Sequence, residues 1–105
     1  MIQAQFINYL ISSGDSSLIT VHNLTVKYFS EYKNEFLFIK AHLDRYGNIP
    51  DAETFVASFP DFELIEVKET HSYLVSELFK DYQTRNIAET FNKVRKLFKQ
   101  NYIFH

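Results

Sequence analysis

The chain has 105 residues, the length of one domain, and it has no cysteine, which excludes disulfides and thiolate metal sites. Two glycines and two prolines are too few for a turn-rich sheet or barrel, so the composition favours long helices joined by few breaks. The net charge of −2 is uneven, because residues 1–89 hold seven Lys or Arg and thirteen Asp or Glu, whereas residues 90–105 hold four cations and no acid.

No apolar run in the sequence approaches the roughly 20 residues needed to cross a bilayer. The first five residues lack the basic start of a secretory signal. The absence of cysteine suits a reducing compartment. We therefore expect a cytoplasmic protein without a membrane segment.

The first part of the chain predicts several short helices. Apolar residues at helical spacing between positions 2 and 11 indicate an amphipathic helix that ends near Gly14, where glycine suits a left-handed cap. A short turn is expected through residues 18–21, and another short piece through residues 26–29.

The clearest helix is predicted from Ser30 to Tyr46, because its apolar residues recur every three or four positions. Gly47 suits the position after the helix, where φ is positive. Pro50 blocks continuation of the helix, and Asp51 is a good N-cap for a further helix over residues 52–58. We interpret Gly47, Pro50 and Asp51 as a structural turn between two helices.

Residues 62–67 are expected to form an extended connector, and one long helix is predicted from Glu69 to about Gln100. This helix carries two apolar stripes. The first consists of Leu74, Leu78 and Tyr82, and the second of Ile87, Phe91, Val94 and Phe98. The stripes are out of phase, which predicts that the two parts of the helix pack against different neighbours.

The predicted fold is therefore an all-α domain of about five or six helices, with a body of residues 1–68 and a long helix of residues 69–100. The helical stripes also predict the residues of the hydrophobic core. These are Phe6, Leu10, Phe36, Ile39, Leu43, Phe55, Phe59, Leu74 and Leu78.

The sequence contains no pattern typical of catalysis. It has no phosphate-binding loop, no zinc-binding H-E-x-x-H, and no nucleophile with a neighbouring base. The four histidines are scattered at positions 22, 42, 71 and 105, and His42, beside the apolar face of its helix, is interpreted as structural. We expect no enzymatic activity, no cofactor and no metal.

Residues 36–67 carry a more specific pattern: an amphipathic helix ending in Tyr-Gly, then x-Ile-Pro-Asp, x-x-Thr-Phe and Phe-Pro-x-Phe. The matching residues are Phe36, Ile39, Tyr46, Gly47, Ile49, Pro50, Asp51, Thr54, Phe55, Phe59, Pro60 and Phe62. This segment resembles the N-terminal domain of DnaB-type replicative DNA helicases, in the form found in phages and mobile elements. Residues 5–11 are similar to the family's first helix, and residues 72–75 to the start of the first arm of its helical hairpin.

The resemblance implies a non-catalytic helical domain of a hexameric helicase. In that family these domains pair through the hairpin, form a collar above the motor ring, and offer surfaces to primase and helicase loaders. The ATPase motor lies further along the parent chain. The second hairpin arm falls outside these 105 residues, so we expect the natural chain to continue and this part to dimerise weakly or in a non-native arrangement.

The leading hypothesis is thus an assembly domain that binds further copies of itself and a primase or helicase loader. Its association surface is predicted at Tyr82, Ile87, Phe91, Val94 and Phe98. The cations Arg95, Lys96 and Lys99 flank this stripe and would contact an acidic partner or nucleic acid. The alternatives are a small nucleic-acid-binding protein that uses the basic C-terminal helix, or a merely solvated helix end.

Overall fold

The computed structural model describes the backbone of residues 1–103 and the side chains of residues 1–98. Over residues 1–103 the chain forms five α-helices and one 3-10 helix and contains no strand. The elements are α1 (Ile2–Ser13), α2 (Ser17–Val21), η1 (Val26–Tyr28), α3 (Lys33–Tyr46), α4 (Ala52–Ser58) and α5 (His71–Ile103). The prediction of an all-α fold with a long C-terminal helix is confirmed.

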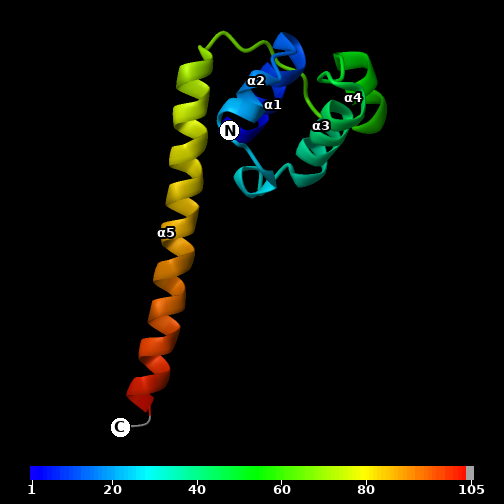
Figure 1. Ribbon diagram of the computed structural model, residues 1–105. Coiled ribbons are helices and arrows are strands. Elements are labelled where there is room, and N and C mark those ends of the chain that lie inside the picture. The colour runs from blue at the N-terminus through cyan, green and yellow to red at the C-terminus, as the bar shows by residue number, and fades with distance from the viewer. Residues whose placement is uncertain (104–105) are drawn as a thin grey trace.

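Helices α1 to α4 gather at one end of α5, which packs against α1 and η1 and then extends well beyond them (Figure 1). The molecule is accordingly elongated, with extents of 60 × 26 × 24 Å. Among the helices that the structure describes, none combines the length and apolarity needed to cross a membrane.

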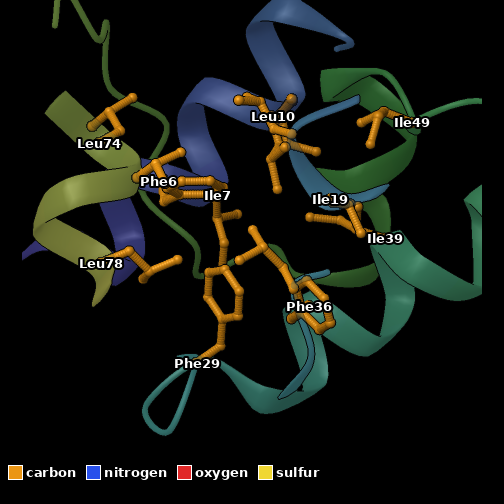
Figure 2. Packing of buried hydrophobic residues seen from close by; sticks show 14 of the residues in the cluster. Phe6, Ile7, Leu10, Ile19, Phe29, Phe36, Ile39, Ile49, Leu74 and Leu78 are labelled. Carbon is orange, nitrogen blue, oxygen red and sulfur yellow. The ribbon is translucent and has the colours of Figure 1, made fainter. Parts of the chain in front are cut away.

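The centre of the core is an aromatic cluster. The ring of Phe29 stacks on that of Phe36, with centroids 4.5 Å apart, and meets the edge of Phe6 at 5.9 Å. Figure 2 shows Leu74 and Leu78 entering this core from α5. These contacts join α1, the segment after η1, α3 and the first turns of α5 into one hydrophobic cluster.

Seven of the nine predicted core residues are buried, and Leu43 and Phe59 are half-buried at the edge of the cluster. The prediction omitted several other buried residues. They include Ile7, Leu18, Ile19, Leu24 and Phe29. Residues 17–29 form only short or irregular elements, so helical periodicity is a poor guide to burial there.

The turn between α3 and α4 has the predicted geometry. Gly47 has φ of 80° and its N–H donates to the carbonyl of Leu43 at 2.8 Å, which ends α3. The carboxylate of Asp51 accepts a hydrogen bond of 2.8 Å from the N–H of Thr54 and so caps α4. His42 Nδ1 lies 2.8 Å from a carbonyl of this turn, in agreement with a structural role.

The predicted start of α3 at Ser30 is wrong by three residues, because α3 begins at Lys33. Ser30 and Glu31 instead bind the side chain of Gln3, through the Ser30 hydroxyl and the Glu31 N–H. A tertiary contact thus replaces the first turn that local periodicity predicted.

Phe36→Ala should lower the free energy of unfolding by about 3–5 kcal/mol, because it removes a buried ring and leaves a cavity. Leu37→Ala is the matched control, since Leu37 follows Phe36 in the same helix but is 50% exposed. Urea titration measures both. Equal small effects would show that the Phe29–Phe36 stack is not central to stability.

The N-cap at Asp51 should make stability depend on pH. Hydrogen bonds from Thr54, chiefly from its backbone N–H, hold the pKa of Asp51 below its usual value. Because the folded pKa is depressed, the stabilisation is present above the unfolded pKa and is lost as pH falls through the folded value. Asp51→Ala should therefore lower the melting temperature at pH 7, and the difference from wild type should shrink in acid. Asp51→Asn, which retains a capping oxygen, should cost less at pH 7.

Candidate functional site

The outer part of α5 exposes a row of large apolar side chains. Ile87, Phe91, Val94 and Phe98 are between 56% and 71% exposed. We call these four residues the outer stripe. Scattered exposed apolar residues are normal, but a continuous row along one helix is a candidate interaction surface.

The outer stripe lies on the opposite face of α5 from the residues that contact the body. Ile87 follows the buried Leu78 by nine residues, which is about two and a half helical turns. The phase change predicted from the sequence therefore turns the outer stripe away from the side on which the body packs.

Tyr82 does not share this surface, and its prediction as a residue beyond the reach of the body is wrong. It is half-buried, with its ring 4.9 Å from that of Tyr28 in η1. Lys27 and Arg85 lie 5.1 and 5.7 Å from the centroid of the same ring. Because η1 packs beside Tyr82, the body contacts α5 further along the helix than the predicted association surface implies.

A polar network fixes α5 to the body where the helix leaves it. The amide nitrogen of the buried Gln3 donates to Ser30 Oγ at 3.1 Å and to Asp81 Oδ2 at 3.2 Å. Arg85 Nε donates to the same oxygen of Asp81 at 3.2 Å. This role of Gln3 was not predicted, although a polar residue on the apolar face of α1 is a signal of such a contact.

The predicted basic residues lie near the free end of α5. Arg95 and Lys96 are exposed, as is Lys93, whereas the side chain of Lys99 lies outside the described residues. Leu97, which was not predicted as a site residue, is 61% exposed beside them. Positive charge and apolar surface therefore occur together on this part of the helix.

A second surface feature lies on the body, between α1, α3 and the end of α4. It is a groove of about 680 Å³, a size typical of binding pockets. Its apolar lining includes Tyr32, Phe59 and Phe62, and its acidic lining consists of Glu35, Asp61 and Glu63. We call it the acidic groove. It was not predicted from the sequence, because its residues come from three separate segments.

One buried side chain holds the wall of the acidic groove in place. Asn8 Nδ2 donates to the carbonyls of Ala4 at 3.0 Å and Glu63 at 3.2 Å, and Asn8 Oδ1 accepts from the N–H of Ile65 at 2.9 Å. The connector of residues 62–67 is thereby fixed to α1. The groove is a formed feature of the fold, although the connector has no regular secondary structure.

The three histidines within the described residues are not brought together. His22 packs beside Phe79, His42 contacts the turn after α3, and His71 begins α5, whereas His105 lies outside the described residues. No group of three or more His, Cys, Asp or Glu side chains is placed to hold a metal ion within the part of the chain that the structure describes.

Comparison of the chain with protein-family models, curated proteins and solved structures finds no significant match.

Asp81→Ala should destabilise the protein by about 1–3 kcal/mol, because it leaves polar groups of Gln3 and Arg85 without their partner in a partly buried site. Asp44→Ala removes another i,i+4 pair, with Lys40, on an exposed surface and should cost no more than about 0.5 kcal/mol. Chemical denaturation compares the two variants. Equal losses would contradict a structural role for the network around Gln3.

Proposed function

We propose that this chain is a non-catalytic N-terminal scaffolding domain of a cytoplasmic replicative DNA helicase. In this role it associates the subunits of the ring and docks a primase or a helicase loader. The observation that carries the proposal is the outer stripe of α5, a row of exposed apolar residues on a helix that extends beyond its own body.

The resemblance of residues 36–67 to the helicase family supports this proposal. Several of the matching residues have a defined structural role in the fold. Gly47 ends α3, Asp51 caps α4, and Phe55 is fully buried beneath them. The pattern thus describes a structural device, two helices joined by a defined turn, and agrees with a domain that assembles rather than catalyses.

The direction of the outer stripe supports association between molecules. Since the stripe faces away from the body-contact side, the body of the same chain does not cover it. A partner helix that packs on the stripe and its flanks would contribute to an interface of the usual size, about 1,200–2,000 Å² in total. Association through a single arm should be weak, because the hairpin of the resembled family has two.

Phe91→Glu combined with Phe98→Glu should abolish self-association, because it places two charges within the outer stripe. Wild type should sediment as a weak, concentration-dependent dimer. The control is Ser76→Glu combined with Asn86→Glu, which adds the same charge at exposed positions off the stripe and away from Lys93 and Lys96. Sedimentation equilibrium over a range of concentrations measures all three proteins.

The control variant should dimerise like wild type. A wild type that stays monomeric at high concentration contradicts the outer stripe as an assembly surface. Dimerisation that persists in the Phe91→Glu, Phe98→Glu variant contradicts it as well, since apolar pairing cannot tolerate two buried unpaired carboxylates.

The alternative function, nucleic-acid binding by the basic end of α5, is favoured by one observation. Arg95 and Lys96 are exposed, and further up the same helix Tyr82 lies between Lys27 and Arg85. Aromatic rings flanked by cations are typical of single-strand binding. Titration of a fluorescent single-stranded oligonucleotide at several salt concentrations separates the two functions, because phosphate binding weakens steeply as salt rises whereas apolar association does not.

A further inference from the structure

The acidic groove has a composition that selects a particular kind of occupant. Its lining residues Glu35, Asp61 and Glu63 contribute three negative charges, and no Lys, Arg or His side chain lines it. The α-amino group of Met1, another lining residue, is the one cation there among the residues that the structure describes. Phe59 and Phe62 are half-buried and offer an aromatic floor. The complementary ligand is therefore an apolar side chain with cations beside it.

The end of α5 presents that combination on one of its faces. Lys93, Lys96 and Leu97 have the i, i+3, i+4 spacing that places three side chains on one side of a helix. All three are exposed. This face borders the outer stripe at Leu97, which follows Val94 by three residues, whereas Lys96 lies about 140° or more around the helix from Phe91 and Phe98.

The end of α5 does not reach the groove of its own chain. The helix is continuous from His71 to Ile103. At about 1.5 Å per residue, Lys96 lies roughly 35–40 Å along the axis from the start of the helix, which is the end where the body packs. Figure 1 shows the end of α5 far from α1, α3 and α4. Only a second molecule can bring the two surfaces together.

We propose that the acidic groove of one copy receives the end of α5 from a second copy, with Leu97 on the floor formed by Phe59 and Phe62. Lys93 and Lys96 then face Asp61 and Glu63 across the rim. This inference rests on the proposed self-association and deepens it, since it assigns a contact that the outer stripe does not make.

Charge complementarity indicates that the occupant of the acidic groove is a second copy of this chain. Residues 1–89 have an excess of six acids, and residues 90–105 carry four cations and no acid. Each molecule thus holds both halves of the contact. If each of two copies places its helix end in the groove of the other, the assembly is a closed dimer. If each copy instead binds the groove of a further copy, the assembly is a ring or a filament.

Zero-length carbodiimide cross-linking tests the contact directly, because it joins a lysine to a carboxylate only when the two groups touch. The sample is a 1:1 mixture of ¹⁵N-labelled and unlabelled wild type, and mass spectrometry locates the linked peptides. We expect mixed-isotope links from Lys93 or Lys96 to Asp61 or Glu63, and fewer of them at high salt. Links within one isotope only, or no links to the groove, overturn the inference.

Charge reversal supplies a second test. Lys93→Glu with Lys96→Glu, and Asp61→Lys with Glu63→Lys, should each weaken association about tenfold, because like charges then meet. A 1:1 mixture of the two variants should recover most of the affinity. All four positions are exposed, so the variants should melt like wild type. Failure of the mixture to recover overturns the pairing.

The two proposals fail in different ways. If the charge variants associate like wild type while Phe91→Glu, Phe98→Glu dissociates, the groove contact is wrong and the outer stripe stands. If charge reversal weakens association and the stripe variant does not, the groove contact stands and the stripe is wrong. A wild type that stays monomeric and forms no mixed-isotope links overturns both.

Discussion

The half-turn between the two apolar faces of α5 is the constraint on which the rest of the molecule depends. Leu74 and Leu78 point into the core, and the outer stripe, which starts at Ile87, points the other way. If both apolar stripes of α5 lay on the same face of the helix, the body could pack along that face and bury both of them. The change of phase instead separates a part of α5 that completes the fold from a part that is left for other molecules.

That separation requires the body to hold α5 firmly over a short length. Two kinds of contact do so. The aromatic cluster around Phe29 and Phe36 provides apolar surface against which α5 packs. The side chain of Gln3 donates a hydrogen bond to Asp81 just before the helix leaves the body. Apolar burial supplies most of the free energy, whereas the buried amide fixes direction, because its hydrogen bonds form only in one register.

Much of this fold follows from local signals in the sequence. The caps at Gly47 and Asp51 and the periodicity of α5 are properties of a few neighbouring residues, so their helices were predicted with the right type and nearly the right bounds. The burial of Phe29 was not predictable in this way, because it packs through the irregular segment that carries η1. Tyr82 has the spacing of Leu74 and Leu78, and its contact with Tyr28 agrees with that stripe rather than with the predicted association surface. The acidic groove was not predicted either, because Asn8 assembles it from segments that are distant in the sequence.

The acidic groove and the end of α5 carry opposite charges. Acids surround the groove on the body, and cations lie at the end of a helix that projects away from it. Two molecules that approach with their helix ends side by side bring cations against cations, and two that approach through their grooves bring acids together. Contact between the end of one molecule and the body of another relieves both repulsions. Long-range electrostatics thus favours an orientation in which the helix end of one molecule meets the body of another. The outer stripe alone does not select this orientation, because the hydrophobic effect is non-directional.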